Sequence, residues 1–387
     1  MSRATSGPDL GVYLHVPFCE HICPYCDFAV EAVGRLPADA EEEWLAGIRL
    51  EWRRWRGALA GRRVASIYFG GGTPSLLRPK SLGAVLELLA ADLDFAEPEI
   101  TVELNPGQLE VARVPELRAA GVTRLSVGLQ STHADTLRRL GRAHGPEEAL
   151  AGLAACLEAG FASLSADLIY GAPGQTVGMV LTDVERLLAL RVPHVSAYAL
   201  TLEGDTPFVR AERAGKLELP DEDAVVEMSQ RLRAALNAAG VAQYEISSFA
   251  RLGHRSRHNQ RYWQRRDVLG LGPSAASFVG GRRLRNARSR AEWLRALRAA
   301  TPPSVEDEPV PTAEARREAL YLGLRRLGGV SRAGYLREFG APPEAFLGPE
   351  LARLRARELV LDEAGHIRLS ERGLLFADEV FEELVGR

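Results

Sequence analysis

The alternation of two kinds of segment between residues 12 and 200 limits the possible folds more than any other feature of the sequence. Short runs of apolar and β-branched residues, typical of strands, alternate with longer amphipathic stretches such as EEEWLAGIRLEWRRW and LGAVLELLAADL. Because parallel strands need long crossover connections, this order predicts a parallel sheet with helices outside it. The six expected strands are residues 12–16, 65–69, 100–103, 124–128, 163–169 and 194–200.

Length and composition narrow the class of protein. A chain of 387 residues suits one large domain with one or two small ones. A formal net charge of -3 gives no general attraction to nucleic acid or to an anionic membrane. The sequence has no unbroken apolar run long enough for a transmembrane helix, and residues 1–16 lack the apolar run of a signal peptide. We therefore expect a cytoplasmic protein without a membrane anchor or nucleic-acid partner, as a monomer or weak homodimer.

Three of the four cysteines, Cys19, Cys23 and Cys26, lie within the segment HVPFCEHICPYCDF. Three thiolates cannot complete a four-ligand zinc site alone, and no pair of Cys or His follows at finger-like spacing. Thiolates also hold iron–sulfur clusters, and a cubane bound by three cysteines leaves one iron open to another ligand. A cluster is our leading interpretation. A zinc site completed by His15 or His21 and three incidental cysteines are the alternatives.

Glycines and polar residues follow the expected strands, and in parallel barrels the chemistry sits at the C-terminal strand ends. The second strand runs into FGGGTPS, whose glycines let the backbone approach a ligand closely. The third ends in VELNPG, the fourth ends in SVGLQS, and LGRAHG follows. The fifth, LSADLIYGAPGQT, carries Asp167 in an apolar run, where a carboxylate needs a partner. Each feature alone could be a turn or a solvated side chain, but the set in this order predicts a ligand site.

The spacing C-x3-C-x2-C, with Tyr25 before the last cysteine, resembles the signature of radical S-adenosylmethionine (SAM) enzymes. Together with the strand-end motifs, YLHVPFC resembles the coproporphyrinogen-III-dehydrogenase-like branch over nearly the whole chain. The resemblance implies a 4Fe-4S cluster on Cys19, Cys23 and Cys26, with SAM on the open iron. Carried over motif by motif, the implied cofactor contacts are Tyr13, Tyr25, Phe28, Gly71, Gly72, Thr73, Glu103, Gln130, Arg142, Asp167 and Ala199.

Two features distinguish this chain within that branch. Phe28 stands where the anaerobic coproporphyrinogen dehydrogenases have a further cysteine, and RHNQRYWQ carries an H-N-x-x-Y-W pattern that resembles the HemW family of haem chaperones. This resemblance implies a protein that binds haem, the cluster and SAM and delivers haem to respiratory-chain proteins. Whether the protein is an enzyme stays open. The alternatives are a coproporphyrinogen III dehydrogenase, which decarboxylates propionates, and a radical SAM methyltransferase or cyclopropanase.

The H-N-x-x-Y-W segment supplies the candidate haem contacts. His258 could be an axial ligand, because imidazole is the usual donor to haem iron. Tyr262 and Trp263 could stack on a porphyrin. Alternatively, the segment packs against the barrel and His258 holds a backbone group, or His254 is the ligand instead.

The expected fold is α/β, a partial parallel (β/α)6-type radical SAM barrel with a small C-terminal helical, winged-helix-like module. Residues 1–250 form the core barrel in this interpretation, and 251–300 carry the H-N-x-x-Y-W segment and a barrel extension. Residues 301–313, rich in proline and acidic residues, are expected to be a linker. Residues 314–387 form the C-terminal HemN-type domain, with a hairpin in LVLDEAGHIRLS turning at residues 363–365. Acidic residues match the basic ones there, which argues against DNA binding.

Overall fold

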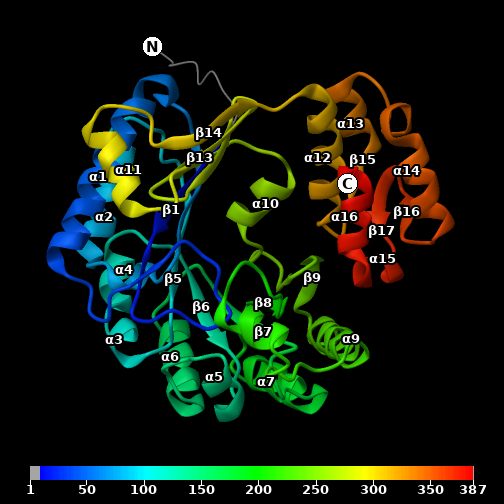
Figure 1. Cartoon of the computed structure of the whole chain (residues 1–387), viewed down its shortest axis with the longest axis horizontal. Coiled ribbons are helices and arrows are strands. Elements are labelled where there is room, and N and C mark those ends of the chain that lie inside the picture. Colours follow the sequence, from blue (N-terminus) through cyan, green and yellow to red (C-terminus); the bar gives the residue numbers. More distant parts are fainter. Residues whose placement is uncertain (1–8, 387) are drawn as a thin grey trace.

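The computed structural model describes residues 9–386, apart from the side chains of residues 108 and 109. Its centre is a twelve-stranded curved sheet with the order β14-β13-β12-β11-β1-β4-β5-β6-β7-β8-β10-β9 (Figure 1). All six predicted strands are confirmed, and neighbours among them pair in parallel. Their bounds are β1 Leu10–Val16, β4 Val64–Gly71, β5 Glu99–Leu104, β6 Arg124–Gln130, β7 Ser163–Tyr170 and β8 His194–Ala199.

Helices cover the convex face of this sheet, as Figure 1 shows. Several begin with proline in the first turn, where the missing N–H is not needed, and Thr176 and Asp221 cap two of them through their side chains. The helices of this part are α1 Ala38–Leu59, α2 Pro79–Ala90, α3 Gln108–Val111, α4 Val114–Ala119, α5 Ala134–Arg139, α6 Pro146–Glu158, α7 Val177–Ala189, α8 Pro207–Arg213 and α9 Glu222–Ala238, with the 3-10 turn η1 Pro74–Leu76.

Strands at both ends extend the parallel core without closing it. On one side β11 pairs with β1 in parallel, and β12, β13 and β14 follow antiparallel; on the other, β10 and β9 follow β8 antiparallel. The structure therefore confirms the partial barrel. The bounds are β9 Ala242–Glu245, β10 Ser248–Ala250, β11 Val268–Leu271, β12 Ala276–Val279, β13 Arg282–Asn286 and β14 Ser304–Pro309, with α10 Arg257–Trp263 and α11 Arg290–Arg298 between them and a separate pair, β2 Phe18–Cys19 and β3 Glu31–Ala32.

The segment 301–313, which we interpret as a linker, contains the edge strand β14. Its composition is poor for a strand, but β13 faces it with arginines. Arg282 pairs with Asp307 at 2.7 Å, and Arg285 pairs with Glu306. Opposite charges on facing strands stabilise the pairing, which a linker prediction from composition does not include.

The C-terminal part has its own hydrophobic core and consists of helices with a small sheet of order β15-β17-β16. The predicted hairpin is β16–β17, and its turn is Ala364-Gly365, both with positive φ as a tight hairpin turn requires. The elements are α12 Thr312–Leu324, β15 Val330–Ser331, α13 Arg332–Phe339, α14 Glu344–Ala356, β16 Val360–Glu363, β17 His366–Leu369, α15 Glu371–Leu375 and α16 Ala377–Val385. Within residues 9–386, no helix combines the length and hydropathy needed to cross a membrane.

Candidate functional site

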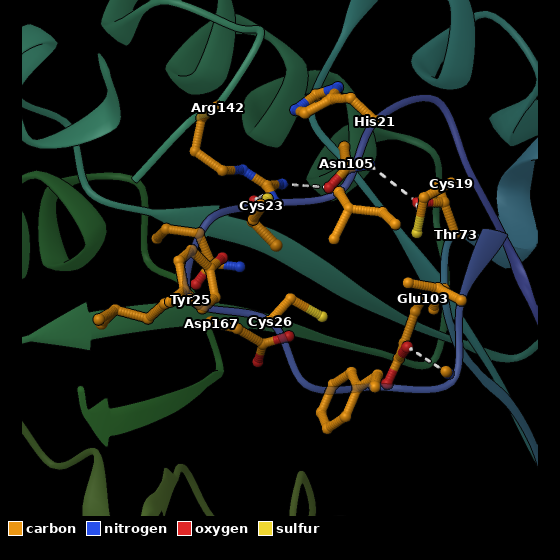
Figure 2. Close-up of a pocket in the computed structure, with 18 of the residues that line it drawn as sticks. Cys19, His21, Cys23, Tyr25, Cys26, Thr73, Glu103, Asn105, Arg142 and Asp167 are labelled. Atoms are coloured by element: carbon orange, nitrogen blue, oxygen red, sulfur yellow. Dashed lines mark hydrogen bonds between the residues drawn. The ribbon is translucent and has the colours of Figure 1, made fainter. Parts of the chain in front are cut away.

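A pocket of about 820 Å³ lies over the C-terminal ends of the parallel strands, under the loop that connects β1 to α1. All three predicted cluster cysteines line it. Figure 2 shows them on different sides of the space, Cys19 beside Thr73, Cys23 beside Arg142 and Cys26 toward the middle. The structure thus brings the thiols to the strand ends, where the sequence predicts the site.

The cysteine loop is fastened to its surroundings at several points. Near its start β2 pairs with β3, and the amide of Phe208 donates to the Pro24 carbonyl at 3.0 Å. The ring of His15 contacts the Ala29 carbonyl through Nε2 at 2.9 Å, and His21 contacts the Gly141 carbonyl at 2.7 Å. Both histidines thus use Nε2 to hold backbone carbonyls of the loop or of its neighbour.

Two donors face the sulfur atoms. The Thr73 hydroxyl lies 3.7 Å from Cys19 Sγ, and Arg142 Nη1 lies 3.6 Å from Cys23 Sγ. Burial raises the pKa of Cys19 to about 11 and also raises that of Cys26, so ligation has to displace protons from these thiols. Among residues 9–386, no three His, Cys, Asp or Glu side chains are grouped as a single metal ion requires. Three thiols spread around one space, with donors aimed at sulfur, fit a multi-iron cluster better than one zinc ion.

Two of the glycines at the end of β4 and directly after it, Gly71 and Gly72, are needed because the chain packs closely against β1 and the start of the cysteine loop. A Cβ on Gly72 would lie 2.5 Å from the Phe18 carbonyl oxygen, and one on Gly71, whose φ is +105°, would meet the His15 ring at 2.5 Å. The amides of Gly72 and Thr73 donate to Val16 and Phe18 carbonyls at 2.8 and 2.7 Å. Gly71, Gly72 and Thr73 all line the pocket, so the same close packing presents their backbone to it.

Glu103, at the end of β5, is a partly buried carboxylate in the pocket wall. It accepts from the Tyr68 hydroxyl at 2.8 Å and from the Gly71 amide at 3.1 Å. Burial raises its pKa to about 7, and these two hydrogen bonds oppose the rise. Its protonation state therefore changes close to neutral pH.

Arg142 reaches across the pocket between two strand ends. Nη2 donates to the Gly128 carbonyl at 3.0 Å and to the side chain of Asn105, while Nη1 faces Cys23. Its buried Nε finds no partner in the described part of the chain. A buried donor without a partner is costly, and the guanidinium that carries it is part of the pocket wall, where it could pair with an anionic group.

Asn105 is held in turn by Glu110, whose part in the site the sequence did not reveal. Glu110 accepts from the backbone amide and side chain of Asn105 at 2.7 and 3.1 Å, and also from Ser75. These groups orient the arginine. The asparagine of ELNPG was the available signal, but nothing in the sequence pointed to a buried carboxylate five positions later.

Asp167 lies at the bottom of the pocket. It accepts from Ser126 at 2.7 Å and Ser165 at 2.8 Å, and burial raises its pKa. The sequence predicts that a carboxylate in an apolar strand needs a partner, and two serines serve as partners of Asp167. Tyr198, at the end of β8, also lines the pocket.

The remaining implied cofactor contacts are arranged in two ways. Tyr25, Phe28, Gln130 and Ala199 line the pocket, and Phe28 is exposed at 69%. Tyr13 is not among the lining residues; its hydroxyl contacts His15 Nδ1 at 3.1 Å. Tyr13 therefore supports the cysteine loop indirectly, through His15, whose ring contacts the Ala29 carbonyl.

The H-N-x-x-Y-W helix α10 lies against β4, apart from the described pocket lining. The His258 ring is 1% exposed; Nδ1 contacts Ser66 at 2.9 Å, and Nε2 contacts the Tyr262 hydroxyl at 3.0 Å. Burial lowers its pKa to about 3, so the ring is neutral. Haem ligation through Nε2 would have to replace the bond to Tyr262, and the haem contacts stay a prediction.

Trp263 and His254 also have partners within the protein. Trp263 Nε1 donates to Glu245, and the guanidinium of Arg325 lies 4.5 Å from the centre of a Trp263 ring. His254 Nδ1 contacts Ser163 at 3.1 Å. In this conformation Trp263 joins the barrel to the C-terminal part.

Comparison with protein families shows two matches. The radical SAM superfamily matches residues 13–187, and the HemN C-terminal domain matches residues 310–376. The chain is 33% identical to heme chaperone HemW of Lactococcus lactis over 374 residues, 96% of each chain. It is 33% identical to heme chaperone HemW of Escherichia coli K12, over 97% of this chain and 98% of the relative.

Among solved structures, coproporphyrinogen III oxidase (HemN) from Escherichia coli, described as a radical SAM enzyme, is similar with a TM-score of 0.84. The match covers 97% of this chain and 90% of that one at 23% identity. At this identity the likeness shows a shared fold that includes the C-terminal part, and it does not carry a function.

Proposed function

The chain belongs to the HemW family of the radical SAM superfamily, and on that premise we propose that it is a cytoplasmic haem chaperone. In this proposal it binds a 4Fe-4S cluster, SAM and haem, and delivers haem to respiratory-chain proteins. The observation that carries the proposal is the near full-length likeness to HemW proteins, combined with three cysteines that line one pocket.

The residues around the pocket have the chemistry that the cofactors need. Cys19, Cys23 and Cys26 would hold the cluster, and the guanidinium of Arg142 would pair with the SAM carboxylate. Glu103 and Asp167 offer acceptor oxygens to hydroxyl or ammonium donors. When bound, the cluster supplies the electron for radical chemistry on SAM, whereas the protein residues bind, orient and shield.

The alternative, coproporphyrinogen III dehydrogenase, fits the pocket less well. Its substrate carries four propionates, yet Arg142 is the only arginine or lysine among the described lining residues. The lining includes acidic side chains at Glu20, Asp27, Glu148 and Glu203. An acidic mouth repels a polyanion, and Phe28 replaces the further cysteine of those enzymes.

The cofactor part is tested with the full chain reconstituted anaerobically. Cys23→Ser should lose most cluster iron and sulfide, because a three-thiolate site has no spare ligand. The control is Cys156→Ser, since Cys156 is buried in α6 away from the pocket lining. Equal iron and sulfide in wild type and Cys23→Ser would remove Cys23 from the ligand set.

The haem part is tested by absorbance titration of two variants of α10. If His258 ligates haem through Nε2, His258→Ala should lose the axial-histidine spectrum. Tyr262→Phe should bind haem more tightly, because it removes the hydroxyl that competes for the same nitrogen. Identical spectra and affinities in all three proteins would exclude His258 as ligand.

Delivery and catalysis are then separated in the same preparation. Haem-loaded protein should transfer haem to a respiratory haem protein in its haem-free form, and coproporphyrinogen III with SAM and reductant should keep its propionates. Substrate-dependent decarboxylation by cluster-loaded protein would replace the chaperone proposal with the dehydrogenase.

A further inference from the structure

A chain of buried hydrogen bonds leads from Asp167 away from the pocket to strand β9. Ser165 donates to Asp167 at 2.8 Å, Ser165 Oγ lies 2.8 Å from His194 Nδ1, and His194 Nε2 lies 2.9 Å from the Tyr244 hydroxyl. Ser165 and His194 are 1% exposed and Tyr244 is 5% exposed. His194, on β8, joins two other strands of the sheet, because both of its ring nitrogens contact side-chain hydroxyls, those of Ser165 on β7 and Tyr244 on β9.

One arrangement of protons satisfies all the groups of this chain. Ser165 has a single hydroxyl proton, which it donates to Asp167, and it also contacts Ser196 Oγ at 3.1 Å. In this arrangement His194 Nδ1 donates to Ser165, and Nε2 accepts from the Tyr244 hydroxyl. The Tyr244 oxygen in turn accepts from the Ser256 amide at 3.1 Å, at the N-cap of α10. All donors point toward the carboxylate, and such aligned bonds strengthen one another.

Strand β9, which carries Tyr244, is also the strand to which the C-terminal part is attached. The Leu327 amide donates to the Tyr244 carbonyl at 3.1 Å, and the Ile246 amide donates to the Arg325 carbonyl at 3.0 Å. The neighbouring Glu245 accepts from Trp263, on whose ring Arg325 lies. A movement of the C-terminal part therefore acts on the backbone of Tyr244, whose hydroxyl is the β9 end of the hydrogen-bond chain.

We propose that Tyr244 and His194 are positioning residues for the SAM site and that they couple this site to the docked C-terminal domain. They act through Ser165, which fixes the orientation of the Asp167 carboxylate and leaves its other lone pairs to a ligand. The inference rests on the proposed SAM site. It adds a role for residues outside the pocket and a route by which domain docking changes cofactor affinity.

The test measures SAM dissociation constants by calorimetry on the cluster-loaded full chain. Tyr244→Phe keeps the ring and removes the hydroxyl, and it should weaken SAM binding roughly three- to tenfold, the effect of one hydrogen bond in a charge-terminated chain. The matched control is Tyr335→Phe, because the Tyr335 hydroxyl is also buried and donates to the Arg316 carbonyl, within the C-terminal domain. The control should bind SAM as the wild type does.

Repeating the measurement in a second variant distinguishes a positioning effect on Asp167 from a general loosening of the structure. Ser165→Ala cuts the chain beside Asp167, so adding Tyr244→Phe to it should weaken SAM binding no further. Hydrogen exchange adds a readout at the domain contact: SAM should slow exchange of the Leu327 amide in the wild type and not in Tyr244→Phe. The inference would be wrong, with the proposed SAM site unaffected, if Tyr244→Phe weakened SAM binding by the same factor in the wild type and in Ser165→Ala. It would also be wrong if Tyr244→Phe left SAM affinity unchanged. Failure of the cluster-loaded wild type to bind SAM would overturn it together with the proposed SAM site.

Discussion

Single residues in the pocket are ionisable groups whose properties are set by burial. Glu103 is the clearest case, because its pKa of about 7 lies well above the usual value of a glutamate. Burial penalises the charged form, and two hydrogen bonds reduce that penalty only in part. Between the ordinary glutamate pKa and about 7, the unfolded chain releases this proton first, so Glu103 costs folding stability progressively as pH rises through that window.

The same shift predicts a pH dependence of SAM binding. A ligand that donates hydrogen bonds to Glu103 prefers its ionised form, so SAM affinity should rise as pH increases through about 7. Titration calorimetry across roughly pH 6 to 8 measures it. Glu103→Gln should remove this step, while the titration of the SAM amino group is common to both proteins and cancels in the comparison. A step of equal size in the variant would show that Glu103 does not titrate in the site.

Among single residues, the sequence predicted those site residues that belong to short local motifs. It did not predict the site residues whose role depends on how distant strands are arranged. Cys19, Gly72 and Arg142 lie in short patterns directly after strands, and all of them line the pocket. Tyr68 and Glu110 contribute as much to the geometry, but one lies inside an apolar strand and the other in a short helix. Their roles depend on which strand ends lie side by side, and local sequence does not contain that information.

Among the elements, helix α1 is fixed by one buried carboxylate. Glu51 accepts from the Gly272 amide at 2.8 Å, from Asn286 at 2.6 Å and from Trp293 at 3.0 Å. These donors come from the barrel extension, so Glu51 joins α1 to strands more than two hundred positions later. Beside it, Gly47 leaves room for the Trp293 ring, which a Cβ would meet at 2.3 Å.

Glu51→Gln should therefore destabilise the barrel extension. The amide group places an N–H among three donors and leaves at least one of them unpaired, which should lower the free energy of unfolding by about 2 kcal/mol. Denaturant unfolding measures the change. Glu43→Gln is the matched control on the same helix, because half-exposed Glu43 also contacts α11 through Arg290 and should matter by less than about 1 kcal/mol. Equal losses in the two variants would contradict the role given to Glu51.

Helix α10 shows that a sequence motif does not predict the packing of the helix that carries it. The H-N-x-x-Y-W pattern lies on this helix, but its spacing says nothing about which surface the helix faces. The structure packs His258 on Tyr68 with ring centroids 5.1 Å apart and turns Trp263 toward the C-terminal part. Both contacts join residues far apart in the sequence. The local sequence therefore could not decide whether this segment packs against the barrel.

For the whole molecule, the contact between barrel and C-terminal domain depends on a buried ion cluster. Glu318 of α12 is buried and binds Arg265 at 3.0 Å, together with Arg283 of β13. Removing its charge takes away the buried partner that the two arginines share, and each arginine keeps only a more exposed carboxylate, Glu338 or Glu314. Glu318→Gln should therefore loosen the domain contact.

Hydrogen exchange resolved along the chain measures this loosening, as faster exchange in α12 and in β9 with the parallel strands unchanged. The matched control is Glu314→Gln, one turn earlier on the same helix. Its carboxylate meets the same Arg283 at 2.9 Å but is 45% exposed, so exchange should remain close to that of the wild type. Protection of α12 that stays intact in Glu318→Gln would show that the backbone bonds to β9 suffice for docking.

The overall architecture was predictable because β/α alternation and strand-end motifs repeat along the chain, and the likeness to HemN confirms the fold. The edge strand β14 was not predictable from its own residues. Its stability comes from arginines on β13, and a composition rich in acidic residues and proline usually indicates a connection.

That strand also affects how molecules of this protein meet one another at high concentration. An open sheet has two free borders, and unpaired backbone groups at a border recruit strands from other copies. Here one border carries Glu306, Asp307 and Glu308 and ends at Pro309, while on the other Glu245 of β9 pairs with Arg326 of the C-terminal domain. Charged side chains and the proline at the end of β14 make the first border a poor template for a second copy, and the domain covers part of the second, so both borders of the open barrel oppose edge-to-edge pairing.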